Sequence, residues 1–208
     1  MKKPLVIAID GPSASGKGTL ASKVARHFGF AYLNTGAIYR LVALRAIRQR
    51  MDLHNIDEEI PSLTRAISEK DLSDEDLFSE EVGHVASVIA KNAKLRSSIF
   101  DFQRRFVEHG KREEGGCVLE GRDTTTVIAP DADFKFYIEC DVETRAQRRF
   151  KQLQNSSYEE ILAQLKKRDE SDINRAESPL KVAQGAHIID NGKLSIDEAV
   201  AKIIKIVS

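Results

Sequence analysis

The chain has 208 residues, 41% hydrophobic and 31% charged, a balance typical of a soluble globular protein and unlike that of a disordered one. Its 32 lysines and arginines match its 32 aspartates and glutamates, so the formal net charge is +0. A neutral chain argues against a constitutive binder of nucleic acid or of a membrane surface, since both need a basic excess.

The N-terminal segment alternates an apolar run with a helical pattern. The run over residues 5–9 predicts a buried strand, which Asp10 and Pro12 end. The run is too short for a signal-peptide core or a membrane span. From about Gly16 apolar residues recur every four positions, which predicts a helix that Gly29 ends. A second strand and a second helix are expected over residues 30–33 and 37–49.

The segment over residues 52–78 has the weakest pattern in the chain. It is rich in acidic residues and contains one proline. Leu63, Ala66 and Ile67 indicate a helix within it.

Two further helices are expected before the next strand. Ser79 precedes two glutamates, a pattern typical of an N-cap with an acidic first turn, and this helix is expected to reach about Ala90. Apolar residues at helical spacing predict another helix that ends at about Glu108. Because residues 38–109 contain no strong strand, we expect them to form a helical insertion packed beside the sheet.

The C-terminal part returns to alternating strands and helices. Strands are predicted over residues 117–119, 134–138 and 187–189. Helices are predicted over residues 142–154, 158–167 and, with Ser195 as its cap, 196–204. The polar residues 168–179 predict a loop. This alternation favours an α/β fold with a parallel sheet covered on both faces.

Residues 11–17, GPSASGK, fit the pattern GxxxxGK between a predicted strand and a predicted helix. Glycines let backbone N–H groups turn toward a phosphate, and the helix N-terminus adds partial positive charge. Lys17 can reach the outer phosphates as a point charge. The hydroxyl residue that usually follows this lysine is replaced by Gly18, and Thr19 comes one place later. We interpret the segment as a phosphate-binding loop rather than an ordinary strand–helix turn.

Several arginines follow predicted strands or flank the polar loop. Arg40 comes soon after the second strand, and Arg122 comes soon after the third, while Arg168 and Arg175 border the polar residues. A single arginine is more often a surface residue. Arg122, however, is expected at the carboxyl end of a parallel strand, where ligands bind in open α/β sheets. Converging arginines and a lysine would offset the negative charges that meet when a phosphate is transferred.

Four segments of the chain resemble bacterial cytidylate kinases, and the resemblance runs from about residue 4 to the C-terminus. They are residues 11–19, 34–40, 121–123 and 168–175. The resemblance implies a single P-loop kinase domain over residues 1–208, a three-layer sandwich with a five-stranded parallel sheet. Its parts would be a core over residues 1–37 and 110–208, a monophosphate-binding insertion over 38–109 and a lid over 168–179.

The same resemblance implies transfer of the γ-phosphate of ATP to CMP or dCMP, with Mg²⁺ bound together with ATP. The implied catalytic residues are Lys17, Arg122 and Arg175. The implied ATP-binding residues are Gly11, Pro12, Ser13, Ala14, Ser15, Gly16, Lys17, Gly18 and Thr19. The implied substrate-binding residues are Thr35, Arg40, Ser87, Arg96, Arg122, Asp123, Arg168, Asp172 and Arg175.

Cytosine recognition would fall to Ser87, Arg96 and Asp123. A carboxylate can accept from the 4-amino group of cytosine, and a guanidinium can donate to N3 or O2. Uracil reverses the pattern at position 4, which leaves polar groups unpaired. Two alternatives remain: Asp123 as a structural partner of Arg122, and Ser87 as a helix-surface hydroxyl.

The chain departs from the family pattern at a few places. Thr35 stands where serine is common, and Asn34 where aspartate is common. Ser171 and Ile173 replace frequent arginines, so the lid is less basic. The segment over residues 51–78 is short, and the insertion is expected to be reduced and more helical.

Two other functions remain open at this point. One is a P-loop kinase for another small acceptor, such as UMP or an alcohol. The other is a non-catalytic nucleotide-binding module, which only the basic residues 145–151 favour; we interpret these as lid-side or solvated surface. A GTPase switch would also need a motif such as NKxD, which the sequence lacks.

Cysteine and histidine usage completes the expectations. Two cysteines, Cys117 and Cys140, exclude a disulfide framework and are interpreted as small core residues of a reducing compartment. We therefore expect a cytoplasmic monomer that binds ATP and CMP or dCMP but neither nucleic acid nor membrane. The five histidines lack ligand spacing, so no protein metal site is expected: His27, His54, His84, His109 and His187.

Overall fold

The computed structural model describes residues 3–53, 56–68, 70–152 and 156–208. The chain forms two compact units. Unit 1 comprises Met1–Leu33 and Val107–Ser208, and unit 2 comprises Asn34–Phe106. His54 and the predicted helix end at Gln154 lie outside the described residues.

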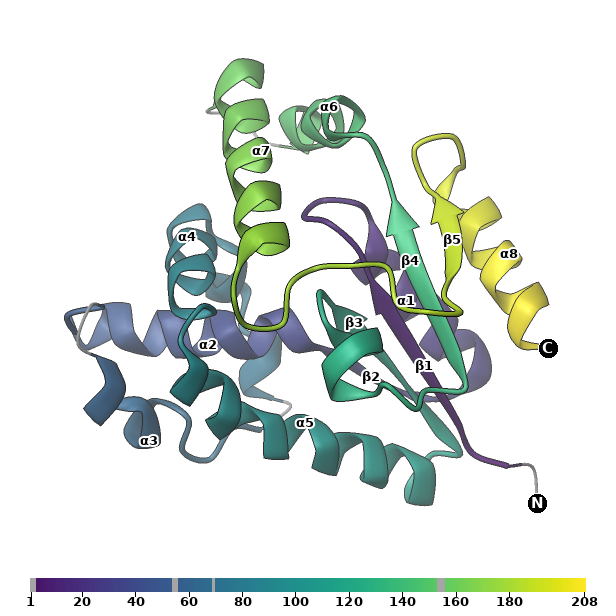
Figure 1. The fold of residues 1–208 in the computed structure, drawn as a ribbon, viewed down its shortest axis with the longest axis horizontal. Coiled ribbons are helices and arrows are strands. Elements are labelled where there is room, and N and C mark those ends of the chain that lie inside the picture. The colour runs from purple at the N-terminus through teal and green to yellow at the C-terminus, as the bar shows by residue number, and fades with distance from the viewer. Residues whose placement is uncertain (1–2, 54–55, 69, 153–155) are drawn as a thin grey trace. The chain divides into compact units, whose positions relative to one another are not determined.

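Unit 1 contains a five-stranded sheet in the order β2-β3-β1-β4-β5 (Figure 1). Its strands are β1 (Leu5–Asp10), β2 (Ala31–Asn34), β3 (Gly116–Gly121), β4 (Phe134–Glu139) and β5 (His187–Asp190). β1 pairs in parallel with both β3 and β4, and β4 pairs in parallel with β5. The register places Asp10, the last residue of β1, opposite Gly121 and Tyr137. The predicted five-stranded parallel sheet is confirmed.

Helices cover both faces of this sheet, as the alternating pattern predicts. The three helices concerned are α1 (Lys17–Phe28), α5 (Ala93–Glu113) and α8 (Ile196–Val207). On one face, Leu20 of α1 and Ile203 of α8 pack with Val118 in a fully buried cluster. On the other face, the last turns of α5 approach β3 so closely that a Cβ at Gly110 would lie 2.8 Å from the Cβ of Cys117. Each such buried aliphatic side chain stabilises the fold by about 1.5–3 kcal/mol.

The ends of α1 and α8 follow the predicted signals. Gly29 ends α1 in the left-handed conformation, with φ of 69°. Ser195 begins α8, and its Oγ accepts a hydrogen bond from the backbone N of Glu198 at 3.3 Å. Glu198 in turn accepts from the backbone N of Ser195 at 2.8 Å, which completes a capping box.

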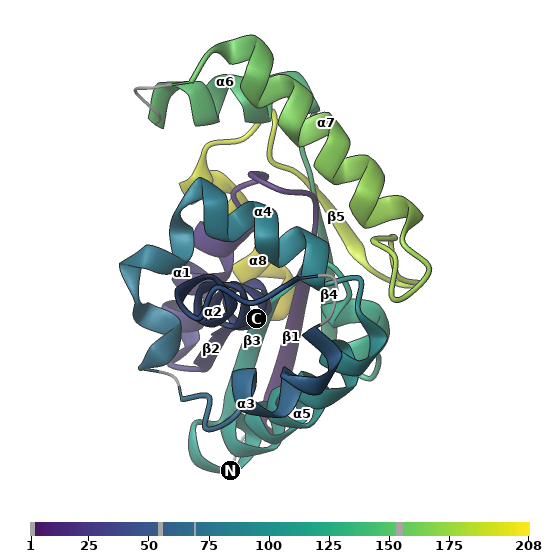
Figure 2. The same cartoon turned by 90° about the vertical axis from the view of Figure 1, so that its left-hand side faces the viewer.

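A pair of helices, α6 (Val142–Gln152) and α7 (Tyr158–Asn174), lies side by side in Figure 2. Ala146 packs there against Ile161 and Leu165. The loop prediction over residues 168–179 is wrong for its first part, because α7 continues to Asn174. That last stretch has a polar sequence, and it is held by ion pairs with arginines distant in the chain, which no local pattern reveals.

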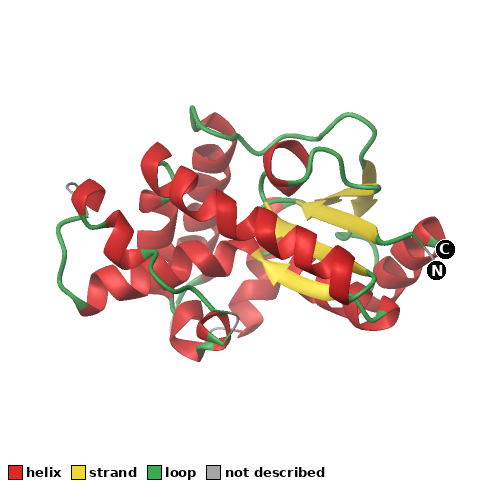
Figure 3. Ribbon diagram, turned by 90° about the horizontal axis from the view of Figure 1, so that it is seen from below, coloured by secondary structure: helices red, strands yellow, loops and turns green. Residues whose placement is uncertain are grey.

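Unit 2 is built from helices and short turns in its described residues after Asn34, seen in red and green in Figure 3. The helices are α2 (Thr35–Arg48), α3 (Ile60–Leu63), α4 (Glu80–Ile89) and the first part of α5; the short 3₁₀ turns are η1 (Ile56–Glu58), η2 (Asp71–Ser73) and η3 (Glu75–Phe78). α2 packs against α4. The helix expected around residues 63–67 is only partly present, because it ends at Leu63 and Ala66 has φ of 50°.

Two other features concern α4 and α5. Ser79 caps α4 as predicted, with its Oγ accepting from the backbone N of Val82 at 3.3 Å. α5 runs to Glu113, past the expected end near Glu108, because Gly110 lets it continue against β3. Among the described residues, no helix combines the length and the apolarity that crossing a membrane requires.

Candidate nucleotide-binding site

The predicted phosphate-binding loop joins β1 to α1 at the middle of the sheet. β1 lies between β3 and β4. Open α/β sheets bind ligands at the carboxyl ends of their strands, at the point where the strand order reverses. In the described structure α1 begins without a side-chain cap and without an acidic residue in its first turn. α4, α7 and α8 each begin with a serine cap and two acidic residues. The start of α1 therefore lacks the side-chain acceptor and the negative charges that those helices have, an arrangement that suits an anion.

The loop conformation depends on Gly16 and on a residue from the far end of the chain. Gly16 has φ of 84°, and a Cβ there would lie 2.6 Å from Nδ2 of Asn191. That Nδ2 donates to the carbonyl oxygen of Ser15 at 2.6 Å. Asn191 follows β5 and is fully buried, so the last strand supports the loop. Sequence reasoning did not assign Asn191 to the site, because a buried asparagine after a strand has no local signature.

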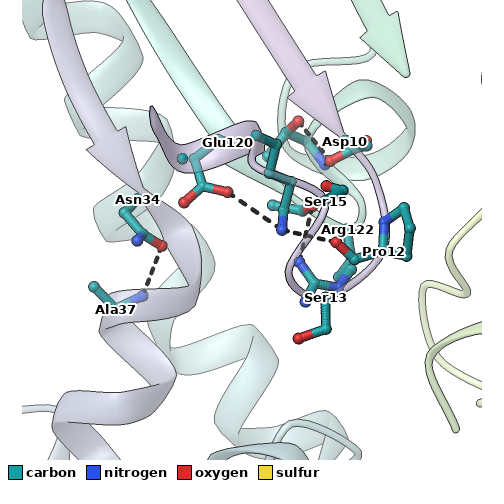
Figure 4. Close-up of polar contacts among 12 residues, drawn as sticks. Asp10, Pro12, Ser13, Ser15, Asn34, Ala37, Glu120 and Arg122 are labelled. Carbon is teal, nitrogen blue, oxygen red and sulfur yellow. Dashed lines mark hydrogen bonds and ion pairs between the residues drawn. The ribbon is translucent and has the colours of Figure 1, made fainter. Parts of the chain in front are cut away.

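Lys17 lies inside the loop, with a side chain almost removed from solvent. Its Nζ donates to the carbonyl oxygen of Pro12 at 3.2 Å and lies 3.8 Å from Oε2 of Glu120, the two oxygens that flank the ammonium group in Figure 4. Burial, and next the positive charge of Arg122, lower the pKa of Lys17 to about 7, although Glu120 opposes this. A buried ammonium group with so little nearby negative charge is costly, and binding of a polyanion would stabilise its charged form.

Glu120 explains the unusual residue that follows the lysine. A Cβ at Gly18 would lie 3.3 Å from Oε1 of Glu120 and 3.8 Å from the hydroxyl oxygen of Tyr32. A serine or threonine side chain at this position would therefore meet a buried carboxylate. The hydroxyl of Thr19, the next residue, belongs to an exposed side chain. Sequence reasoning identified Glu120 only as a strand end, yet it lies at the centre of the site.

A group of charged side chains gathers around Asp172 of α7. Nε of Arg122 donates to its Oδ2 at 2.7 Å, and Nη1 of Arg175 lies 4.0 Å from its Oδ1. Burial would raise the pKa of Asp172, but Arg122 and then Arg168 and Arg175 outweigh it and lower the pKa. Arg122 and Arg168 also act electrostatically on Lys17. Unit 1 thus brings these five predicted residues into one site.

The remaining predicted residue of unit 1, Asp123, is also buried. It directly precedes a π-helical turn, η4 (Thr124–Ile128), which the sequence pattern did not predict. The carboxylate of Asp10 accepts hydrogen bonds from this turn and is fully buried, and burial raises its pKa. Sequence reasoning treated Asp10 only as the end of a strand.

Arg145 of α6 is a further buried group at the loop. Its Nη1 donates to the carbonyl oxygen of Ser13 at 3.0 Å, and its guanidinium pairs with Asp169 at 3.1 and 2.5 Å. Its Nε donates to the carbonyl oxygen of Cys140. The sequence interpretation of residues 145–151 is lid-side or solvated surface. The second alternative is wrong for Arg145, which is buried and links the loop to Asp169 of α7, a residue of the expected lid segment. Both cysteines are buried and free, as expected.

In unit 2, the predicted phosphate residues lie at the start of α2. Asn34 caps this helix, with its Oδ1 accepting from the backbone N of Ala37 at 3.0 Å (Figure 4). Thr35, the first helical residue, is buried. Nη1 of Arg40 donates to the carbonyl oxygen of Leu77 at 2.6 Å. A Cβ at Gly83 would lie 2.8 Å from its guanidinium, so the absence of a side chain there makes room for Arg40.

The two predicted base-recognition residues of unit 2 lie on neighbouring helices. Arg96 of α5 has its guanidinium 5.6 Å from the ring centroid of Tyr39, and its Nη1 donates to the carbonyl oxygen of Ala90 at 3.3 Å. Ser87 lies half-buried on α4. These contacts orient Arg96 by its aromatic neighbour and by the end of α4.

A parallel sheet with this loop after its central strand defines a P-loop kinase fold. Solved structures with this fold include a shikimate kinase from Bacteroides thetaiotaomicron, 13% identical over 98% of each chain with a TM-score of 0.52. A gluconokinase from Sinorhizobium meliloti is 13% identical over 100% of this chain and 97% of that chain, with a TM-score of 0.50. At these identities the likeness shows the fold alone.

Sequence relatives are much closer. The family model "Cytidylate kinase" matches residues 7–208. A cytidylate kinase from Bartonella bacilliformis is 44% identical, covering 95% of this chain and 92% of the relative. One from Rhodopseudomonas palustris is 41% identical, covering 98% and 95%. The chain belongs to the cytidylate kinase family, and the resemblance found in the four segments is confirmed.

Proposed function

We propose that this chain transfers the γ-phosphate of ATP to CMP or dCMP and releases ADP with CDP or dCDP. Family membership supports the reaction. The observation that carries it is the grouping in unit 1 of Lys17 with Arg122, Arg168 and Arg175 around one carboxylate, next to an uncapped helix N-terminus. Such a concentration of cations fits a reaction that joins two phosphate-bearing substrates.

The proposed reaction needs no nucleophile from the protein. An oxygen of the CMP phosphate attacks the γ-phosphorus in line, a new P–O bond forms, and the bond to the β-phosphate oxygen breaks, so that ADP leaves. Residues 11–19 would hold the ATP phosphates by backbone N–H groups and by Lys17. Arg122 and Arg175 would offset the charge that builds up on the transferred group.

Magnesium fits the oxygen groups beside the loop. Oγ of Ser15 is buried and has no hydrogen-bond partner within the described residues. The buried carboxylate of Glu120 lies beside Lys17. Oxygen ligands and phosphates are what Mg²⁺ prefers, so Ser15 and Glu120 are the residues that would hold a nucleotide-bound ion. When bound, the ion would supply positive charge at the phosphate oxygens.

Residues 38–109, most of which belong to unit 2, are the proposed monophosphate-binding insertion. Thr35 and Arg40 would bind the CMP phosphate, and Ser87 and Arg96 would contact cytosine together with Asp123. In unit 1, Arg168 and Asp172 would meet the ribose, and residues 168–179 would form a lid that excludes water, although their first part is helical. We further propose that the protein is cytoplasmic and that it acts as a monomer. Light scattering on the purified chain would test the oligomeric state.

A coupled assay of ADP release tests the proposal. Purified protein is given ATP, Mg²⁺ and one acceptor at a time: CMP, dCMP, UMP, AMP or shikimate. CMP and dCMP should give the highest kcat/KM, and K17M should abolish turnover with all acceptors. Preferred use of shikimate or AMP would contradict the proposal, and ATP binding without ADP release would favour a non-catalytic module.

The role of Arg40 can be tested within the same assay. Arg40→Ala should lower kcat with CMP by about 10²-fold or more, in the range seen when one group that stabilises a charged transition state is removed. The KM for ATP should change little. Arg45→Ala removes an arginine of the same helix that binds the carbonyl oxygens of Leu63 and Arg65, and serves as the control.

A further inference from the structure

The carboxylate of Asp10 accepts four hydrogen bonds from two consecutive threonines. Its Oδ1 accepts from the backbone N and Oγ1 of Thr124, at 2.9 and 2.7 Å. Its Oδ2 accepts from the backbone N and Oγ1 of Thr125, at 2.8 and 2.6 Å. All four partners are donors, so the arrangement is satisfied by an ionised carboxylate in a fully buried position. A buried charge with four donors fixes those donors firmly.

The turn that Asp10 holds begins immediately after Asp123. The carbonyl oxygen of Asp123 accepts from the backbone N of Val127 at 2.9 Å and from that of Ile128 at 3.2 Å. The N–H of the same peptide unit, at Thr124, donates to Asp10. The peptide between Asp123 and Thr124 is therefore held at both its oxygen and its nitrogen. Because the peptide is planar, holding both of its ends restricts the ψ angle of Asp123. The backbone angles in turn restrict which side-chain rotamers of Asp123 are allowed.

We propose that Asp10, through Thr124 and Thr125, is a positioning residue for the recognition of the acceptor base by Asp123. The inference rests on the proposed function, which assigns Asp123 to cytosine. Asp10 is fully buried and both of its carboxylate oxygens are bound by threonines, so it acts through the backbone from which the carboxylate of Asp123 extends. Discrimination between cytosine and uracil depends on a hydrogen bond of defined geometry, so a looser turn lowers selectivity first.

The double variant Thr124→Val with Thr125→Val tests this while keeping every residue of the phosphate-binding loop; because Asp10 directly precedes Gly11, the KM for ATP is measured to detect any change passed on to the loop. Valine keeps the shape and the backbone N–H bonds but removes two of the four donors to Asp10. The matched control is Thr126→Val in the same turn, whose buried hydroxyl oxygen has no hydrogen-bond partner within the described residues. Serine at positions 124 and 125 keeps both hydroxyls and is the rescue variant.

The readout is kcat/KM for CMP and for UMP, with the KM for ATP. Loss of two hydrogen bonds to a charged group predicts that the CMP-to-UMP ratio of kcat/KM falls by about tenfold or more in the valine double variant. The KM for ATP should stay within about twofold, the serine variant should regain the ratio, and Thr126→Val should match the parent. If the double variant does not fold, Thr125→Val alone is measured in the same way.

Two outcomes overturn the inference. One is an unchanged CMP-to-UMP ratio in the folded valine variant; the other is an equal loss with CMP, UMP and ATP, which would indicate a merely structural role. Asp123→Ala separates this failure from failure of the proposed function. If that variant loses selectivity while the valine variant keeps it, only the positioning role of Asp10 is wrong. If Asp123→Ala keeps selectivity, the assignment of Asp123 to the base is itself wrong.

Discussion

Arg122 and Asp172 are 50 positions apart in the chain, yet Nε of the arginine donates to Oδ2 of the carboxylate at 2.7 Å. The pair joins the loop after β3 to the last turns of α7. Both side chains are largely buried. Burial alone would lower the pKa of Arg122, but Asp172, and then Glu120 and Asp10, outweigh it and raise the pKa. The same pair therefore stabilises a helix end and orients a guanidinium of the proposed site.

Asp172→Asn should lower the free energy of unfolding by about 2–3 kcal/mol, because it leaves the buried guanidinium of Arg122 without its charged partner. Urea denaturation measures this change. Asp197→Asn, which breaks an exposed pair with Lys23, is the control and should cost no more than about 0.5 kcal/mol. If the two substitutions lowered the free energy of unfolding equally, the buried pair would contribute no more to stability than the exposed one.

The pH dependence of stability follows from the same pair. In the folded chain the pKa of Asp172 lies below its ordinary value of 3.8. The stabilisation is therefore fully present above that ordinary value and is lost as the pH falls through the lower folded value. The difference in the free energy of unfolding between the parent and Asp172→Asn should therefore begin to shrink as the pH falls below about 4. A difference between them that stays constant down to pH of about 2 would show that no such linkage exists.

Nucleotide affinity should weaken as the pH rises above neutrality. The free protein holds the pKa of Lys17 at about 7, so above that pH the amine is largely neutral. Binding of the phosphates favours the ammonium form and takes up a proton, so Kd should rise by up to about tenfold per pH unit. Titration of a non-hydrolysable ATP analogue with Mg²⁺ between pH 7 and 9 measures this. Lys17→Arg keeps its charge throughout and should flatten the profile; a flat parent profile would contradict the prediction.

The two glycines that flank α1 allow the effect of backbone strain to be distinguished from that of a steric clash. Gly16 and Gly29 both have left-handed φ, 84° and 69°. A Cβ at Gly16 would lie 2.6 Å from Nδ2 of Asn191, whereas a Cβ at Gly29 would meet nothing within 4 Å. Gly29→Ala should cost about 1 kcal/mol of stability and leave the Kd for ATP unchanged. Gly16→Ala should also weaken ATP binding by about tenfold or more, because it displaces the loop.

The outcome that would contradict this argument is equal ATP affinity in the two variants. A second test combines Gly16→Ala with Asn191→Ala, which removes the nearest clashing atom. Asn191→Ala alone is also measured, because it removes the hydrogen bond to Ser15. If the clash dominates, Gly16→Ala should weaken ATP binding less in the Asn191→Ala background than in the parent. Isothermal titration calorimetry gives the affinities, and thermal unfolding gives the stabilities.

Arg145→Gln should destabilise the protein and weaken the connection between the loop and α7. The substitution removes the charged pair with Asp169 and the bond to the carbonyl oxygen of Ser13. We expect a loss of about 3 kcal/mol, since the largely buried carboxylate of Asp169 is left without its charged partner. Lys151→Gln, an exposed change on the same helix, should stay within about 0.5 kcal/mol. A loss below about 1 kcal/mol in Arg145→Gln would contradict the role assigned to this pair.

Contiguous patterns predicted most of the fold. Strand, glycine-rich loop and helix follow one another over residues 5–28, so local hydrophobic spacing and backbone requirements were enough to predict the phosphate-binding loop. The caps at Ser79 and Ser195 act within one turn and were predicted for the same reason. The end of α7 was not predicted, because its polar residues form ion pairs with residues distant in the chain.

The sequence by itself determined the five strands, the loop and the family, since each depends on neighbouring residues or on motifs in a fixed order. Only the tertiary structure decided which buried polar groups support the loop and the turn after Asp123. Asp10 and its threonines are 114 and 115 positions apart, and Asn191 and Ser15 are 176 apart. The sequence around a carboxylate or amide at the end of a strand does not show whether that side chain faces solvent or a buried donor. Its role depends on which distant segment the sheet order brings beside it.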